Sequence, residues 1–253
     1  MITTAILSAL AEEQQGLLAL LANPVRVTRA GRDFWHGELQ GCRVVLGLSR
    51  IGKVAAATTA TTLIEAFGVT QVVFTGVAGG VGPGVQVGDV VVATEFVQHD
   101  MDASPLFPRY QIPLYGRARF PCDASLTALL LAAARSGLAR ARVDVDPQSW
   151  GASASLHAGL IASGDRFVSG AAEARDLHGA LQVAGLAPLA VEMEGAAVAQ
   201  VCFDYGLPFA AVRTISDRAD DQAHVDFPRF VTEVASHYAL EIIRNLMPLL
   251  QKK

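Results

Sequence analysis

Short apolar runs alternate with longer stretches of helical periodicity along the whole chain. The apolar runs have the length of buried strands, and most of them precede a segment with helical apolar spacing. The predicted strands are Thr3–Ala9, Arg26–Ala30, Phe34–Leu39, Cys42–Leu48, Val72–Thr75, Asp89–Thr94, Leu156–Ser163, Ala187–Val191 and Phe209–Ile215. The predicted helices are Glu12–Leu21, Val54–Phe67, Asp123–Ser136, Ala171–Leu181, Glu194–Tyr205 and Pro228–Leu250. This alternation is typical of an α/β fold, and we expect three layers, α/β/α, around a central mixed, twisted sheet.

The chain shows no internal repeat and no linker with a shift in composition, so a single domain over residues 1–253 is the simplest expectation. Gly31 is the predicted turn of a hairpin, and Asp123 is the predicted N-cap of a helix. An irregular insertion near residues 102–122 carries Pro, Tyr and Phe. Two interpretations stay open for it: a lid or contact surface, or an ordered surface excursion.

Composition and charge narrow the class of protein. Hydrophobic residues make up 51% of the 253 residues and charged residues 17%, which excludes a disordered chain. No uninterrupted apolar run reaches roughly 18 residues, so we expect no membrane span. The 20 basic residues against 24 acidic ones argue against a nucleic-acid partner. Residues 1–10 contain no Lys or Arg and Glu12 follows, which is unlike a secretion signal and favours a cytoplasmic location.

Acidic and glycine-rich segments follow four of the predicted strands. They are Glu12–Glu13, the run TGVAGGVGPG at Thr75–Gly84, Glu192–Glu194, and Ser216–Asp217. Ligands in open α/β sheets bind beyond the carboxyl ends of strands, so these four loops can converge on one pocket. The glycine run allows close approach of the backbone to a ligand, although it lacks the lysine and spacing of phosphate-binding motifs, and a structural turn explains it equally well.

Each of these carboxylates has a structural and a chemical interpretation. One of Glu192 and Glu194 can stabilise the start of the following helix, and the other can accept hydrogen bonds from two vicinal ribose hydroxyls. Asp217 can cap a turn or, in a partly buried pocket, donate a proton. Glu13 can cap the first helix or act as a general base, and carboxylates in different environments can divide these acid and base tasks.

Other kinds of catalytic site find no support in the sequence. The six histidines have no metal-binding spacing, and Cys42, Cys122 and Cys202 are too far apart for a zinc motif. The serines lack the context of a nucleophile elbow. We therefore expect no metal, no cofactor and no covalent nucleophile.

Several motifs together resemble the nucleoside phosphorylase and nucleosidase superfamily, and most closely its 5′-methylthioadenosine/S-adenosylhomocysteine nucleosidases. In chain order they are AILSALAEEQQGL from Ala5, SRIGKVAAA from Ser49, TGVAGG from Thr75, VGDVVV from Val87, HD at His99, SGDRFVSG from Ser163, VEMEGAAVA from Val191 and VRTISDRADDQ from Val212. The ordered set spans nearly the whole chain. The resemblance implies a nucleoside phosphorylase-like fold, a homodimer, and an N-ribosyl hydrolase of methionine salvage that needs only nucleoside and water.

The resemblance also implies roles for individual residues. Asp217 would protonate adenine N7, Glu13 would activate water, and Glu194 would bind the ribose hydroxyls. The remaining substrate contacts would come from Met193 against the sugar, Phe167 and Val168 at adenine, Ile51 and Phe227 at the 5′ substituent, and Val77, Ala78, Gly79, Glu192 and Ser216 around them. Ring protonation, water activation and stabilisation of a ribosyl cation each need one carboxyl group, and three are present.

The chain departs from the usual pattern of these nucleosidases at several positions. Val77 replaces a common serine, so a hydroxyl near the acid is lost, and Leu10 replaces a common methionine. Arg218 follows the acid where a small apolar residue is usual. The 102–122 segment is longer than usual and carries Arg109, Arg117 and Arg119.

Three alternatives remain beside hydrolysis of a 5′-thio-substituted adenosine. A phosphorylase would use phosphate in place of water, although Phe74 lies where phosphorylases of this superfamily often have an arginine. Another hydrolase could act on futalosine or, given Arg50 and the loop arginines, on a 5′-phosphorylated nucleoside. A nucleoside-binding protein without catalysis would not need Glu13, Glu194 and Asp217 together.

Overall fold

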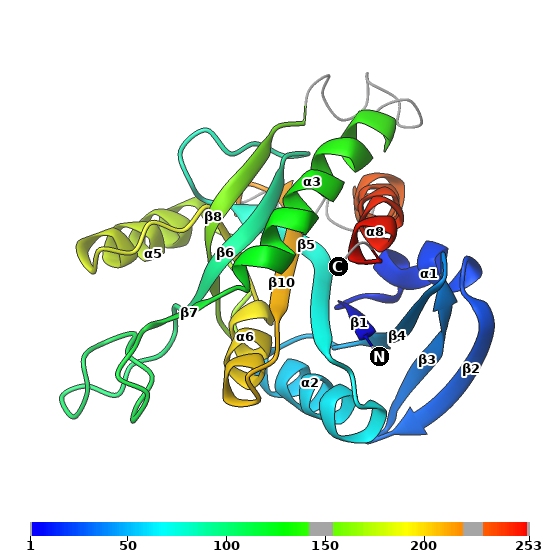
Figure 1. Ribbon diagram of the computed structural model, residues 1–253. Coiled ribbons are helices and arrows are strands. Elements are labelled where there is room, and N and C mark those ends of the chain that lie inside the picture. The colour runs from blue at the N-terminus through cyan, green and yellow to red at the C-terminus, as the bar shows by residue number, and fades with distance from the viewer. Residues whose placement is uncertain (1, 142–153, 220–229, 252–253) are drawn as a thin grey trace.

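The structure is a computed structural model that describes residues 2–141, 154–219 and 230–251 (Figure 1). Its strands are β1 (Thr3–Ser8), β2 (Ala22–Arg29), β3 (Arg32–Leu39), β4 (Cys42–Leu48), β5 (Gln71–Gly80), β6 (Val90–Gln98), β7 (Arg119–Pro121), β8 (Leu156–Ser163), β9 (Ala190–Glu192) and β10 (Phe209–Asp217). Its helices are α1 (Ala11–Ala19), α2 (Lys53–Phe67), α3 (Ala124–Ala141), α5 (Ala171–Val183), α6 (Gly195–Asp204) and α8 (Ser236–Leu250), the last preceded by a π-helical turn, η1 (Val231–Ala235).

All of these strands belong to one mixed sheet with the order β10-β6-β8-β9-β5-β1-β4-β3-β2, and β7 pairs with β6. β1 runs parallel to both β4 and β5, and β5 runs parallel to β10. Because β10 also pairs with β6, the strands β5, β10, β6, β8 and β9 form a closed ring of ladders. The strands β1, β4, β3 and β2 extend the sheet from β5 away from this ring (Figure 1).

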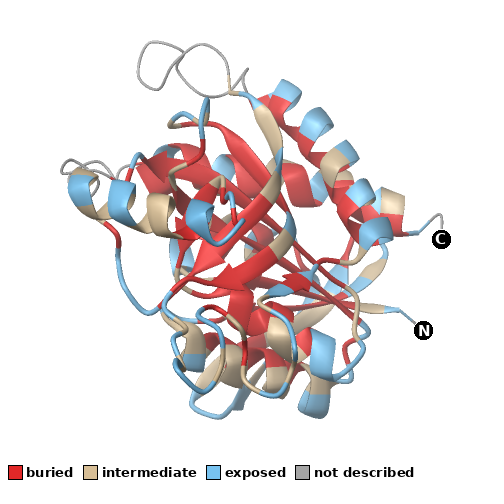
Figure 2. Cartoon of the chain, turned by 90° about the vertical axis from the view of Figure 1, so that its left-hand side faces the viewer, coloured by how far each residue is buried: buried red, intermediate tan, exposed pale blue. Residues whose placement is uncertain are grey.

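Helices cover both faces of the sheet, because the residues of its central strands alternate between two apolar clusters. In β10, Ala211 packs in the cluster that contains residues of α2 and α6. The next residue, Val212, packs in the cluster that contains residues of α3 and α8. Figure 2 shows this buried interior between the more exposed outer helices. The predicted α/β/α architecture with a mixed central sheet is therefore confirmed.

Most predicted elements occur within a few residues of their predicted bounds. The hairpin around Gly31 is confirmed by the antiparallel pairing of β2 with β3. Asp123 caps α3 as predicted, since its Oδ1 accepts a hydrogen bond of 2.7 Å from the Leu126 amide. Helix α3 continues five residues further than predicted, to Ala141.

Two predictions about strands were wrong. We predicted that the strand from Val72 ends at Thr75 in a glycine turn, but β5 continues through the glycines to Gly80 because β10 and β9 pair with them. The predicted strand Ala187–Val191 is shorter and shifted, and β9 begins only at Ala190.

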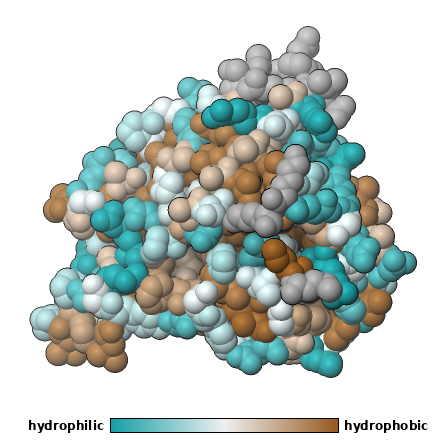
Figure 3. All heavy atoms as spheres, viewed as in Figure 1, coloured by the Kyte–Doolittle hydropathy of each residue, from teal (hydrophilic) through white to brown (hydrophobic). Residues whose placement is uncertain are grey.

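The 102–122 segment projects from the sheet and ends in the short strand β7, which the sequence did not predict (Figure 1). Leu106 and Leu114 in this segment are 84% and 91% exposed. Figure 3 shows hydrophobic residues gathered where the segment projects. In the described part of the chain, no helix has both the length and the apolar character needed to cross a bilayer.

Candidate active site

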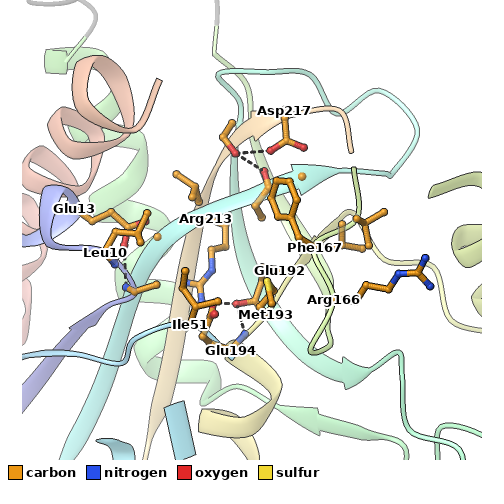
Figure 4. Close-up of a pocket in the computed structure, with 18 residues that line it drawn as sticks. Leu10, Glu13, Ile51, Arg166, Phe167, Glu192, Met193, Glu194, Arg213 and Asp217 are labelled. Atoms are coloured by element: carbon orange, nitrogen blue, oxygen red, sulfur yellow. Dashed lines mark hydrogen bonds and ion pairs between the residues drawn. The ribbon is translucent and has the colours of Figure 1, made fainter. Parts of the chain in front are cut away.

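A cavity of about 280 Å³ lies at the carboxyl ends of β1, β4, β5, β8 and β10 (Figure 4). Parallel strands bring the residues that follow them to the same edge of the sheet, so segments far apart in sequence meet there. The lining residues are Ala9, Leu10, Glu13, Ile51, Gly76, Val77, Ala78, Gly79, Arg166, Phe167, Val168, Val191, Glu192, Met193, Glu194, Arg213, Ser216 and Asp217.

This cavity brings together every predicted site residue that the structure describes. These residues are Glu13, Ile51, Val77, Ala78, Gly79, Phe167, Val168, Glu192, Met193, Glu194, Ser216 and Asp217. Phe227, which was predicted for the same site, lies outside the described residues. The four loops thus meet at one edge of the sheet, as expected.

Glu13 lies in the first turn of α1 and is 2% exposed. Its Oε2 accepts hydrogen bonds of 2.9 Å from the amides of Ala9 and Leu10, so the predicted capping interaction occupies one carboxylate oxygen. Its Oε1 accepts no hydrogen bond among the described residues. Burial raises the pKa of Glu13 to about 7, against the opposing effects of the Leu10 amide and the Arg213 guanidinium. A carboxylate of this pKa is suited to take up a proton near neutral pH.

Asp217 ends β10 at the opposite side of the cavity, as Figure 4 shows. The Ser216 hydroxyl donates to its Oδ2 and the Ala219 amide donates to its Oδ1, both at 2.7 Å. The capping role considered for Asp217 is therefore present as well. β5 passes directly beside this carboxyl group, and a Cβ at Gly79 would lie only 2.9 Å from Oδ1. The glycine run thus makes room for the Asp217 side chain.

Glu192 and Glu194 lie on either side of Met193, and the structure gives them different partners. Glu192 accepts hydrogen bonds from the Ser163 hydroxyl and from the Gly195 amide at the start of α6, and it forms an ion pair of 2.8 Å with Arg213. Glu194 accepts a hydrogen bond of 2.8 Å from the Gly52 amide. Burial and the neighbouring Glu192 carboxylate raise the pKa of Glu194. Glu192 is therefore the one that stabilises the helix start.

Arg213 is a pocket residue that the sequence analysis missed. Its side chain is 1% exposed and lies over the Phe74 ring, with Cζ 4.1 Å from the ring centroid. Its Nη1 also donates to the carbonyl oxygen of Phe74. The signal in the sequence was a single charged residue inside the otherwise uncharged strand FAAVRTIS, because an arginine is rarely buried unless it is paired.

Comparison with known proteins places this fold and site in a family. Residues 3–247 match the phosphorylase superfamily. The chain is 37% identical over 249 residues to a 5′-methylthioadenosine/S-adenosylhomocysteine nucleosidase of Anoxybacillus flavithermus, which covers 98% of this chain and 99% of the relative. The chain belongs to the 5′-methylthioadenosine/S-adenosylhomocysteine nucleosidase family of this superfamily.

Solved structures of similar proteins agree with this membership. The nucleosidase of Neisseria meningitidis in complex with methylthio-immucillin-A superposes with a TM-score of 0.85 at 33% identity, covering 98% of this chain and 99% of that one. The futalosine hydrolase of Helicobacter pylori superposes with a TM-score of 0.84 at 31% identity, covering 98% of both chains. The fold of this chain therefore occurs both in a 5′-methylthioadenosine/S-adenosylhomocysteine nucleosidase and in a futalosine hydrolase.

Apolar side chains line the nucleosidase pocket beside the carboxylates. Phe167 and Ile51 are 45% and 59% exposed, so both lie near the mouth of the cavity. Arg166, a second residue that the sequence analysis missed, also lines the pocket and forms an ion pair with Glu173. The ring of Phe167 offers a flat apolar surface and the side chain of Ile51 an aliphatic one, so both can contact the apolar parts of a ligand.

The departures from the usual nucleosidase pattern differ in their consequences for the site. Val77 and Leu10 line the pocket, and Arg218 is exposed outside it. None of the loop arginines lines the pocket, since Arg109 and Arg119 face Asp102 and Glu95. Among the described residues, no group of three or more His, Cys, Asp or Glu side chains is placed to hold a metal ion.

Proposed function

We propose that this chain is a hydrolase that cleaves the N-glycosidic bond of 5′-methylthioadenosine, S-adenosylhomocysteine or both, releasing adenine and a 5-thio-substituted ribose. The observation that carries the proposal is the meeting of three carboxyl groups, Glu13, Glu194 and Asp217, in one cavity of a member of this family. These substrates would place the enzyme in methionine salvage.

Asp217 is proposed as the acid that protonates adenine N7. A protonated purine leaves more readily because the electrons of the breaking C1′–N9 bond no longer produce an anionic base. The two hydrogen bonds from Ser216 and the Ala219 amide hold the carboxyl group in place. Phe167 would stack on adenine, the Val168 backbone would contact its edge, and Ala78 and Gly79 would lie beneath it.

Glu13 is proposed as the base that removes a proton from the attacking water. The water oxygen would bond to C1′ of the ribosyl cation as the proton passes to the free Oε1. The pKa of about 7, which burial sets, lets the carboxylate be ionised at neutral pH while it remains basic enough to accept that proton. Its second oxygen is held by two amides, so the orientation of the free one is fixed.

Glu194 is proposed to accept hydrogen bonds from the two ribose hydroxyls through its carboxyl oxygens, which would also face the ribosyl cation. Met193 would pack against the sugar, and Ile51 would contact the 5′ substituent together with Phe227. Glu192 would support this site through its bonds to Gly195 and Arg213 rather than through contact with substrate.

Water is favoured over phosphate as the acceptor. Among the described residues, the two arginines that line the cavity both face carboxylates, Arg213 with Glu192 and Arg166 with Glu173. Arg50 does not line the cavity, and its guanidinium donates to the Gly31 carbonyl oxygen. A phosphate or a 5′-phosphoryl group binds best to an unpaired cation, and none of these three arginines is one.

A substrate panel with and without phosphate tests the proposal. We expect adenine release from methylthioadenosine or adenosylhomocysteine with free thio-ribose as the second product, and lower rates with adenosine, inosine, futalosine and AMP. Ribose 1-phosphate as product would assign the chain to the phosphorylases instead. Asp217→Asn should lower kcat at least about 100-fold by removing the acid, and an unchanged rate would contradict its role.

We also propose a cytoplasmic homodimer. The exposed leucines of the 102–122 segment and Val54, which is 78% exposed, are costly to leave in water and favour contact with a second copy of the chain. Light scattering should give twice the monomer mass of 26.6 kDa. A monomer at micromolar concentration would contradict this part of the proposal.

A further inference from the structure

The start of helix α2 is held by carboxylates from two other parts of the chain. Gly52 occupies the N-cap position with a φ of 97°, and a glycine offers no side chain to cap the helix. Instead, the Gly52 amide donates to Glu194 Oε1 at 2.8 Å, and the next amide, that of Lys53, donates to Asp165 Oδ1 at 2.7 Å. Two consecutive amides therefore bind two carboxylates, one of which lines the cavity.

Lys53, Asp100 and Asp165 form a closed cycle of interactions, which we call the Lys53 clamp. The Lys53 ammonium donates to Asp100 Oδ1 at 2.6 Å, and the Asp165 amide donates to Asp100 Oδ2 at 2.9 Å. Asp165 returns to the Lys53 amide through its own carboxylate. The cycle thus joins the residues after β4, β6 and β8 at one point.

The clamp is sheltered enough to restrain these loops. The side chains of Lys53 and Asp100 are 16% and 31% exposed, so their ion pair is screened less than a pair on the open surface. The Lys53 ammonium also donates to the side-chain amide oxygen, Oε1, of Gln98 at 3.0 Å. Although burial opposes it, the hydrogen bond from Lys53 and that from the Asp165 amide bring the pKa of Asp100 below its ordinary value.

We propose that Lys53, Asp100 and Asp165 are positioning residues that fix the direction of the Gly52 amide and, through it, the orientation of the Glu194 carboxylate. None of the three lines the cavity, so they act through Glu194 and not on the substrate itself. Gly52 must be glycine for this arrangement, because its φ is positive and a Cβ would lie 3.1 Å from Asp165 Oδ1. The inference rests on the proposed role of Glu194 at the ribose hydroxyls.

Variants of Asp165 and Glu194, alone and together, test the clamp. Asp165→Ala removes the acceptor for the Lys53 amide, and we expect kcat for methylthioadenosine to fall about tenfold, with KM changed less than about threefold. Asp165→Asn keeps a carbonyl oxygen at that position and should retain at least about one third of the parent kcat. In a Glu194→Gln background, Asp165→Ala should lower kcat by less than about twofold more, because residues that act as a unit are not additive.

Controls separate this inference from the proposed function and from unfolding. Asp33→Ala removes an aspartate of β3 that is ion-paired with Arg26 of β2 and does not line the cavity, and it should leave kcat within twofold of the parent. If Asp165→Ala does not fold, Lys53→Met, which removes the ammonium and keeps the backbone amide, must show the same non-additivity with Glu194→Gln. Equal losses in the parent and Glu194→Gln backgrounds, or an Asp165→Asn variant as slow as Asp165→Ala, would overturn the clamp. Absence of adenine release by the parent chain would instead refute the proposed function.

Discussion

Two buried glutamates of the same pocket, Glu192 and Glu13, differ in how completely their carboxylates are bonded. Glu192 accepts hydrogen bonds from Ser163 and Gly195 and has the guanidinium of Arg213 at 2.8 Å. Glu13 has backbone donors on one oxygen, while its other oxygen accepts no hydrogen bond among the described residues. Both are less than 10% exposed, so burial alone does not distinguish them.

The difference separates a structural carboxylate from a reactive one. Ionisation of a buried carboxylate is stabilised when a cation and several donors surround it. For Glu13, burial outweighs the backbone amides and the Arg213 guanidinium, so its pKa is raised and it can exchange a proton near neutral pH. Glu192 therefore supports the site, and Glu13 supplies a proton acceptor.

The largest effect is expected from Glu13→Gln, which tests whether Glu13 is the reactive carboxylate. The amide cannot take a proton from water, so we expect kcat for methylthioadenosine to fall by about 10³-fold. The measurement is adenine release under single-turnover conditions, with the folded state checked by circular dichroism.

Glu12→Gln is the matched control, since Glu12 is the neighbouring glutamate of α1 and is exposed. Its kcat should stay within twofold of the parent. A Glu13→Gln variant as active as the Glu12→Gln variant would remove Glu13 from the mechanism.

Glu192→Gln should act mainly on stability. The substitution leaves the guanidinium of Arg213 buried without its counter-charge, which costs about 3–5 kcal/mol in the free energy of unfolding. Urea denaturation measures this loss. The double variant Glu192→Gln/Arg213→Met should lose less than Glu192→Gln alone, and strict additivity of the two substitutions would show that the pair is not coupled.

The pH dependence of stability tests the raised pKa of Glu13 directly. The pKa of Glu13 is raised from 4.5 to about 7 in the folded state, so its contribution to stability is complete below about pH 4.5 and is lost as the pH rises through 7. The Glu13→Gln variant does not titrate there. Its free energy of unfolding relative to the parent should therefore rise between pH 4.5 and pH 8, by on the order of 3 kcal/mol. A difference that stays constant over this range would contradict the raised pKa.

The smallest effect is expected from Val77→Ser, which restores the hydroxyl that this chain lacks beside the acid. Ser216 already donates a hydrogen bond to Asp217, so the added hydroxyl should change kcat/KM by less than about threefold. Steady-state kinetics with methylthioadenosine measure it. A tenfold gain would mean that the Ser216 hydroxyl alone does not hold the acid well.

The sequence was sufficient to predict the residues at strand ends but not the contacts between them. The convergence of the four acidic and glycine-rich segments on one pocket was predicted, because hydrophobic periodicity locates strands and parallel strands share one carboxyl edge. Arg213 was missed because its partner Glu192 lies 21 positions away and only the fold brings them together. The extension of β5 to Gly80 was missed for a similar reason, since its pairing with β10 and β9 overrides the local preference of glycine for turns.

The closed ring of β5, β10, β6, β8 and β9 also limits how the enzyme can move. An open sheet can flex by changing its twist, but in a ring every strand is hydrogen-bonded on both sides, so widening it would break a ladder. The floor of the cavity, which carries Gly79 on β5 and Asp217 on β10, therefore behaves as a rigid frame. Because Asp217 pairs with Gly79 across this frame, we expect the proposed acid to keep a constant distance from the neighbouring strand through each turnover.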